Sequence, residues 1–157
     1  MSLPTRASRT IVMSASPEAI YDLVADVTRT GEWSPECRSC NWLDEPAVVG
    51  SRFRGHNRRG LARWTTTAEV LVADRGREFT FATMHRGRPA TRWAYGLEGD
   101  ADRTILTESF EAISSPWLIA IAERLFIRDR QQQLEAGIAQ TLERIKAIAE
   151  LDRTTGR

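Results

Sequence analysis

The chain has no long apolar run and almost no lysine. No stretch approaches the roughly 18 apolar residues that a membrane-spanning helix needs, and the first residues, MSLPTRASRT, lack the apolar core and cleavage site of a secretory signal. We therefore expect a cytoplasmic protein without a membrane span. Lys146 is the one lysine among 22 basic residues, and the others are arginines. This bias reflects either a GC-rich bacterial genome or the recognition of planar anions.

Motifs that mark several enzyme classes are also missing. The chain contains no G-x-S-x-G nucleophile elbow, no glycine-rich phosphate loop and no H-E-x-x-H zinc motif. It has two histidines, His56 and His85, and two cysteines, Cys37 and Cys40. A zinc site would need two ligands besides the thiols, and these histidines are the only ones available. Residues 41–46 predict a strand and a turn, whereas a thioredoxin-like pair needs a helix start. We expect no metal, no cofactor and two partly buried thiols.

What is present fits one globular domain. The chain has 157 residues, of which 41% are hydrophobic, and a net charge of +1. This length suffices to bury a core, the hydrophobic fraction argues against disorder, and the near-neutral charge gives no general attraction to nucleic acid. Because no repeat or linker interrupts the chain, we predict a single domain over residues 1–157, with a core at 6–150 and flexible ends at 1–5 and 151–157.

Periodicity and turn residues predict a strand, one or two helices, six strands and a long helix. A β-branched run over 6–14 precedes Ser16-Pro17-Glu18, which combines a serine cap, a proline and an acid, as helix starts often do. Gly31 then ends or interrupts the helix. The expected strands are 38–44, 51–58, 63–74, 77–85, 90–98 and 103–112. The short turns between them favour an antiparallel meander.

Residues 116–150 have helical periodicity, but the apolar stripe changes side within them. Leu118, Ile121, Ala122 and Leu125 lie on one stripe, whereas Ile127, Leu134, Ile138, Thr141, Ile145 and Ile148 lie nearly opposite. A straight helix cannot turn both stripes toward one core. We predict an extra helical segment or bend near residues 116–130, with a break or bend near Arg128–Gln133, unless the first half packs against something else.

Alternation along the strands places many aromatic side chains on one face. Trp33, which precedes the predicted strands, and Trp42, which lies in the first of them, are added to this set. The expected ligand-binding residues are then Trp33, Trp42, Phe53, Asn57, Trp64, Phe81, Trp93, Tyr95, Glu108 and Phe110. Polar tips on such a face each need a partner when they are buried. The face is therefore either an ordinary core with satisfied tips or the lining of a cavity for a small molecule. Composition leaves both interpretations open.

Glu108 and Tyr95 are the best catalytic candidates. If Glu108 faces a cavity, desolvation raises its pKa, as a proton-transfer group requires. The alternation over 103–112 is ambiguous, because Ile105 and Thr107 offer an almost equal inward face. Glu108 would then be a solvated outer residue or a partner of Arg92. Asn57 and Tyr95 are candidates for orienting a ligand carbonyl or hydroxyl.

The run from Arg52 to Trp64 mixes arginines with aromatic residues, as surfaces that bind single-stranded nucleic acid do. A period of two, however, places its arginines and His56 on the face opposite Phe53 and Trp64. Stacking and phosphate contacts would then not share a surface. We therefore expect a solvated outer face and no nucleic-acid partner.

The order of elements resembles the START-like, or SRPBCC, superfamily over about residues 6–150. The similarity rests on the early strand and on six segments: SPEAIYDLVADV (16–27), WSPE (33–36), VGSRF (49–53), RWAY (92–95), RTILTES (103–109) and TLERIK (141–146). It is nearest to the group described as polyketide cyclase/dehydrase and lipid transport. The resemblance implies an α+β helix-grip fold, in which a curved antiparallel sheet of about seven strands surrounds a long C-terminal helix. The apolar stretch 116–127 departs from that pattern.

Members of this superfamily bind lipids, sterols, polyketides or other apolar ligands, and some are cyclases or aromatases. The resemblance thus favours a protein that binds a small hydrophobic or amphipathic molecule in an internal cavity. A polyketide-type cyclase or dehydratase that uses Glu108 or Tyr95 is the enzymatic alternative. A third is a protein- or membrane-interaction module that uses residues 117–126. The ligand, turnover and a homodimer all stay open at this point.

Overall fold

A serine-capped helix follows the first strand. The computed structural model describes residues 6–113 and 127–156. Helix α1 (Pro17–Ala25) begins where the sequence predicts, because the Ser16 hydroxyl accepts a hydrogen bond from the Ala19 N–H at 3.2 Å. A 3-10 helix, η1 (Val27–Glu32), comes next, and the Asp26 carboxylate accepts from the Thr28 N–H at its start. Ile20 and Val24 are fully buried and attach α1 to the core.

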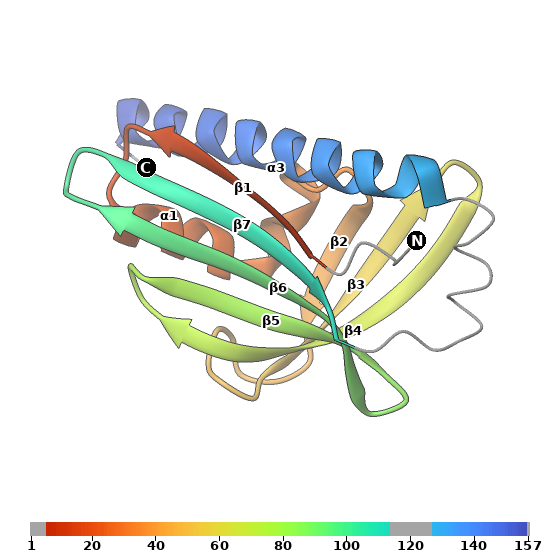
Figure 1. The fold of residues 1–157 in the computed structure, drawn as a ribbon. Helices are drawn as coiled ribbons and strands as arrows, with labels where there is room; N and C mark the ends of the chain where they lie inside the picture. Colours follow the sequence, from red (N-terminus) through yellow and green to blue (C-terminus); the bar gives the residue numbers. More distant parts are fainter. Residues whose placement is uncertain (1–5, 114–126, 157) are drawn as a thin grey trace.

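Seven antiparallel strands form one curved sheet (Figure 1). The strands are β1 (Arg6–Met13), β2 (Cys37–Trp42), β3 (Arg52–Arg59), β4 (Ala62–Asp74), β5 (Glu78–His85), β6 (Arg88–Gly99) and β7 (Thr104–Ala112). Their order in the sheet is β1-β7-β6-β5-β4-β3-β2. The six later strands thus form the predicted meander, and β1 pairs with β7 as an edge strand of the sheet.

The long helix α3 (Ile127–Thr155) lies across the sheet and packs against β1 and β7 (Figure 1). On the same side, α1 packs against β5 and β6. One face of the sheet is therefore covered by helices, and the other faces solvent, as in the predicted helix-grip fold. None of the described helices is long and apolar enough to cross a membrane.

The side chains of α3 that face the core belong to the second apolar stripe predicted from the sequence, the one that includes Leu134 and Ile138. Ile138, Leu142 and Ile145 are buried, and Leu134 and Ile148 pack against the same core from its edge. The helix is continuous from Ile127 to Thr155, so the break predicted near Arg128–Gln133 is wrong. That stretch consists of strong helix formers without glycine or proline, so nothing local interrupts it. The predicted segment 116–126 lies outside the described residues.

The turn between β5 and β6 is tighter than its sequence suggests. We expected four turn residues, 86–89, but β6 already begins at Arg88. The turn consists of Arg86 and Gly87, with φ angles of 51° and 76°. Two central residues with positive φ match the twist of antiparallel strands, and glycine adopts that conformation without strain. A register shift between Thr83 and Met84 accommodates the early start of β6.

Truncation of a buried α3 side chain should destabilise the fold. Ile145 is 0% exposed, whereas Leu151 on the same helix is 62% exposed. Ile145→Ala is expected to lower the free energy of unfolding by about 2–5 kcal/mol through lost burial and a residual cavity. Leu151→Ala is expected to change it by less than about 0.5 kcal/mol. Urea denaturation of both variants checks this difference, and equal losses would contradict the packing of α3 described above.

Candidate functional site

The face of β7 that the sequence left ambiguous is settled by burial. Leu106 is fully buried and Glu108 is 3% exposed, whereas Ile105 is 39% exposed. Side chains alternate along a strand, so Leu106, Glu108 and Phe110 share the helix-covered face of the sheet. Glu108 is therefore an inward residue. Arg92, its suggested partner, lies on the outer face and is aligned with Glu111.

A chain of aromatic rings crosses the same face from β2 to α1. The ring centroids of Trp42 and Phe53 lie 5.4 Å apart, and those of Phe53 and Phe81 lie 5.1 Å apart. Phe81 continues to Phe79 and then to Tyr21, each at 6.1 Å. Most of these contacts are edge-to-face, a favourable arrangement for aromatic pairs. The strands thus build one continuous apolar wall from residues far apart in sequence.

A second aromatic pair lies toward the other edge of the sheet. Trp93 and Phe110 are register partners on β6 and β7, with ring centroids 4.9 Å apart. Both rings, like Phe81 and Trp42, are only partly buried although they point inward. Part of each of these rings therefore remains accessible on the inner side of the sheet. Trp64 is 38% exposed and lies nearest the end of the β3–β4 hairpin.

A small polar centre lies on the same strands as this second pair, two residues along β6 and β7. Tyr95 and Glu108 are register partners on β6 and β7, and the Tyr95 hydroxyl donates to Glu108 Oε1 at 3.4 Å. The buried Trp33 side chain, which follows η1, hydrogen-bonds to the same hydroxyl. Since the indole N–H can only donate, the tyrosine hydroxyl both accepts and donates. Trp33, Tyr95 and Glu108 thus form one hydrogen-bonded chain.

One oxygen of Glu108 ends this chain without a partner. Glu108 Oε2 is buried and forms no hydrogen bond to any group in residues 6–113 or 127–156. Burial raises the pKa of Glu108 to about 8, and the hydrogen bond from Tyr95 offsets only part of that rise. Glu108 is then largely protonated at neutral pH. A protonated Oε2 is a hydrogen-bond donor that lacks an acceptor in this site.

Tyr95 also remains neutral in this environment. Its pKa lies well above the ordinary value, first because of burial and second because of the negative charge that Glu108 can carry. Glu108 therefore favours the protonated form of Tyr95, whereas the hydrogen bond from Tyr95 favours the ionised form of Glu108 and is outweighed by burial. The polar centre is consequently uncharged at neutral pH and has hydrogen-bonding capacity without a counter-ion.

The nearest basic side chain does not neutralise Glu108. Arg9 is the register partner of Glu108 on β1, but its guanidinium lies 3.9 Å from Glu135 of α3. Glu135 also accepts from the Gln131 amide at 2.9 Å. Gln131 Oε1 is the second buried oxygen without a partner in the described parts of the chain.

A β-bulge brings the two cysteines onto the inner side. The register of β2 against β3 shifts between Cys37 and Ser39, so side chains three residues apart point the same way. The two buried thiols are free and lie 3.2 Å apart. The hydrogen bond to Cys40, and then burial, raises the pKa of the Cys37 thiol and keeps it protonated. They pack beneath Gly55 as polarisable core residues, as expected from the sequence.

The remaining predicted residues divide between the inner and outer faces. Asn57 points inward and donates to the Thr66 hydroxyl at 3.1 Å. Its amide is thus partly satisfied within the sheet. His56 is exposed on the outer face, as predicted, and His85 is exposed at the end of β5. In the described parts of the chain no three histidine, cysteine or acidic side chains are arranged to hold a metal ion.

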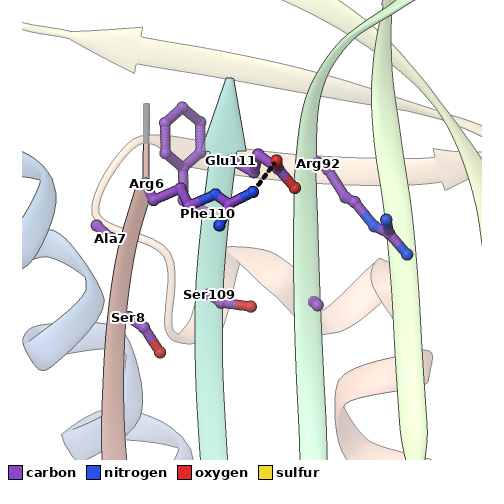
Figure 2. A pocket seen from close by; sticks show the side chains of 8 residues that line it. Arg6, Ala7, Ser8, Arg92, Ser109, Phe110 and Glu111 are labelled. Carbon is purple, nitrogen blue, oxygen red and sulfur yellow. Dashed lines mark hydrogen bonds and ion pairs between the residues drawn. The ribbon is translucent and has the colours of Figure 1, made fainter. Parts of the chain in front are cut away.

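A surface pocket of about 360 Å³ lies away from this polar centre (Figure 2). Ser8, Ala94 and Ser109 lie on the outer side of β1, β6 and β7. The Arg6–Glu111 ion pair, at 3.0 Å, and Arg92 border it. Its lining includes Phe110 but none of the other predicted binding residues. These charged, solvent-facing walls do not form the aromatic site predicted from the sequence.

The register partner of Glu108, Arg9, and the two α3 residues linked to it escaped the sequence analysis. Arg9 appeared only as part of a β-branched strand, and Gln131 and Glu135 appeared only as part of a helix with an expected break. The one available signal was alternation, because Arg9 shares its parity with the inward residues of 6–14. Without the pairing of β1 with β7, that signal could not connect Arg9 to Glu108.

Comparison with known proteins agrees with this fold. A family model described as polyketide cyclase / dehydrase and lipid transport matches residues 4–150. The chain is similar to the polyketide_cyc-like protein Cgl2372 of Corynebacterium glutamicum, with 34% identity, a TM-score of 0.68, and coverage of 94% of this chain and 93% of that one. Among curated proteins, no sequence matches the chain.

Two more distant structures share the fold. One is the Zhui aromatase/cyclase of a Streptomyces species, R1128, with 16% identity, a TM-score of 0.69 and coverage of 94% of each chain. The other is the di-domain ARO/CYC StfQ of the steffimycin biosynthetic pathway, with 14% identity and a TM-score of 0.73. That match covers 96% of this chain but 52% of the di-domain protein. Identities this low support a common fold and nothing more specific.

The buried acid predicts a characteristic pH dependence of stability. The pKa of Glu108 rises from 4.5 to about 8 in the native state, so the unfolded chain loses this proton first as pH rises. Glu108 therefore lowers the free energy of unfolding progressively between about pH 4.5 and pH 8, by roughly 5 kcal/mol at most. Glu108→Gln removes this titration. The variant should gain stability relative to the wild type over that range.

Denaturant unfolding at a series of pH values measures this gain, and Glu111→Gln is the matched control. Glu111 lies on the same strand but on the outer face, where it pairs with Arg6. The difference between wild type and the control should stay constant across the range. A pH-independent difference for Glu108→Gln would show that the carboxyl is not a neutral, desolvated group.

Proposed function

Since the chain belongs to the polyketide cyclase/dehydrase and lipid transport family, we propose that it binds a small, mainly apolar molecule between the sheet and α3. The observation that carries the proposal is Glu108, a buried carboxyl whose Oε2 has no partner among the described residues. A buried polar atom without a partner costs about 1–3 kcal/mol. A ligand that supplies the missing acceptor removes this cost.

The surroundings of Glu108 define the class of ligand. Trp93 and Phe110 lie two residues from Tyr95 and Glu108 on the same two strands, and Phe79 of β5 is the register partner of Tyr95. From Phe79 the aromatic chain continues through Phe81 toward β2. A ligand that buries apolar surface against these rings gains about 25 cal/mol per Å². A neutral carboxyl donates to a carbonyl or ether oxygen and does not attract a cation. The proposed ligand is therefore an apolar or amphipathic molecule with one such oxygen, as in a ketone of a polyketide or a lipid ester.

Binding is tested first by native mass spectrometry of the freshly purified protein and then by displacement of a fluorescent lipid probe. Trp93→Ala should weaken binding of the probe at least about tenfold, since it removes a large apolar contact worth more than 1.4 kcal/mol. Ile105→Ala is the control, because this side chain is on the outer face of the adjacent strand. No probe binding, or an equal loss in both variants, would refute the proposal.

A second candidate function is a cyclase or dehydratase reaction, and the Tyr95–Glu108 pair favours it. A carboxyl with a pKa of about 8 holds its proton at neutral pH and can give it to a ligand oxygen. General acid catalysis is most effective when the pKa of the acid lies near the working pH. The Tyr95 hydroxyl donates to the carboxylate that remains, which stabilises it after proton transfer. Two proteins that share the fold are themselves aromatase/cyclases.

Measuring turnover of a β-keto substrate alongside binding of the fluorescent probe distinguishes a catalytic role from a binding role. If Glu108 supplies a proton, Glu108→Gln should lower turnover by about 10²–10⁴-fold while the fluorescent probe still binds. Tyr95→Phe should lower it less, because it removes a positioning hydrogen bond and not the acid. Unchanged turnover in Glu108→Gln would remove the catalytic candidate and leave the binding proposal intact. The interaction module expected at residues 117–126 lies outside the described residues.

A further inference from the structure

The turn between β3 and β4 carries a leucine whose side chain is almost fully exposed. Gly60 and Leu61 form this two-residue turn, and Leu61 is 97% exposed. The turn lies at the end of the sheet where α3 begins (Figure 1), and Arg59 hydrogen-bonds to Gln133 of that helix. The hairpin end is thus held by α3 while the leucine projects into solvent. We call residues Arg58–Trp64 the β3–β4 tip.

The β3–β4 tip is also strongly basic. The sequence contains no acidic residue between Glu45 and Glu69. Arg58 and Arg63 are register partners, so two like charges lie directly opposite each other on the outer face. Such a pair destabilises a hairpin. In the described residues no carboxylate pairs with either guanidinium, so nothing in that part of the chain offsets this repulsion with a negative charge.

A tryptophan completes the tip. Trp64 follows Arg63, points to the other face of the hairpin and is 38% exposed. Leucine, tryptophan and arginine prefer three successive depths of a lipid surface. Leucine enters the acyl boundary, the indole ring lies at the level of the headgroups, and arginine reaches the phosphates. The tip offers all three within one short hairpin.

We propose that the β3–β4 tip docks the protein on an anionic lipid bilayer. Leu61 inserts at the acyl boundary, Trp64 lies among the headgroups, and Arg58 and Arg63 contact lipid phosphates. The two arginines then gain the counter-charges that their own sheet does not provide. This docking is separate from ligand binding at Glu108, because the tip contributes no group to the polar centre around that carboxyl.

A nucleic acid fits the same surface less well. Arg63 and Trp64 project from opposite faces of β4, so one strand of nucleic acid cannot contact the arginines and stack on the indole together. Leu61 would gain nothing from a polyanion, since it offers neither charge nor a stacking ring. The turn can insert into a bilayer surface, so that side chains on both faces of the β3–β4 hairpin contact lipid. Charge and apolar surface together therefore favour lipid.

Cosedimentation with unilamellar vesicles tests the docking. The full-length protein is mixed with vesicles of phosphatidylcholine alone or of phosphatidylcholine with phosphatidylglycerol. It should sediment with the second kind at low salt and less so at high salt. The double variant Arg58→Gln/Arg63→Gln should partition onto the vesicles about thirty-fold more weakly, because each substitution removes one positive charge close to the lipid phosphates. Leu61→Ser should weaken partitioning about tenfold.

The controls are at the opposite end of the molecule. Arg103 precedes β7 and Leu151 is near the end of α3, and both are exposed. Arg103→Gln and Leu151→Ser should sediment like the wild type. All variants should keep the wild-type circular dichroism spectrum and bind the fluorescent lipid probe in solution with unchanged affinity.

Three outcomes would overturn the docking proposal. The first is no sedimentation with phosphatidylglycerol vesicles at low salt. The second is equal weakening in the tip variants and in the controls. The third is retention of a single-stranded oligonucleotide, unaffected by Leu61→Ser, without vesicle binding, which would assign the surface to nucleic acid. Since probe binding is measured separately, failure of docking is distinguishable from failure of the proposed pocket.

Discussion

Glu108 is a carboxyl buried on the inner face of the sheet, and no described cation pairs with it; the character of the site follows from this constraint. Isolated charges are costly to bury, so the group retains a proton instead of ionising. Tyr95 cannot neutralise it, because a hydroxyl donates a hydrogen bond but carries no charge. Arg9 is aligned with Glu108 across β1 and β7, but it lies next to Glu135 on α3. The groups of the polar centre are therefore uncharged, whereas an ion pair would have kept Glu108 ionised.

This neutrality determines what the surrounding aromatic wall can recognise. A charged carboxylate would favour a cationic or metal-bound ligand, whereas a protonated one favours a neutral oxygen on an apolar body. Both candidate functions use the same proton on the same oxygen. In a binding protein the proton remains on Glu108 and orients the ligand; in a cyclase or dehydratase it moves to the ligand. The fold accommodates either, so the chemistry of the site alone separates them.

The sequence predicted those features that local chemistry determines. Ser16-Pro17-Glu18 predicted the start of α1, and alternation placed Phe53, Tyr95 and Phe110 on the inner face. The strand meander followed from the short turns between the predicted strands. The inner face of 103–112 could not be chosen from alternation, because Ile105 and Leu106 are equally apolar and only pairing with β1 and β6 decides between them. The bulge at Cys37–Ser39 has no local signal either, since it depends on the register against β3. A break near Arg128–Gln133 was wrong because α3 is continuous from Ile127, while the first apolar stripe, at 118–125, lies outside the described residues.

The most direct test of a neutral Glu108 is carbon-13 NMR of the Glu108 carboxyl, assigned by comparison with Glu108→Gln. We predict that the carboxyl titrates near pH 8 in the free protein. We also predict a higher pKa when a ligand oxygen accepts its proton, because that hydrogen bond stabilises the protonated form. Titration near the ordinary value of 4.5, unchanged by ligand, would contradict the account.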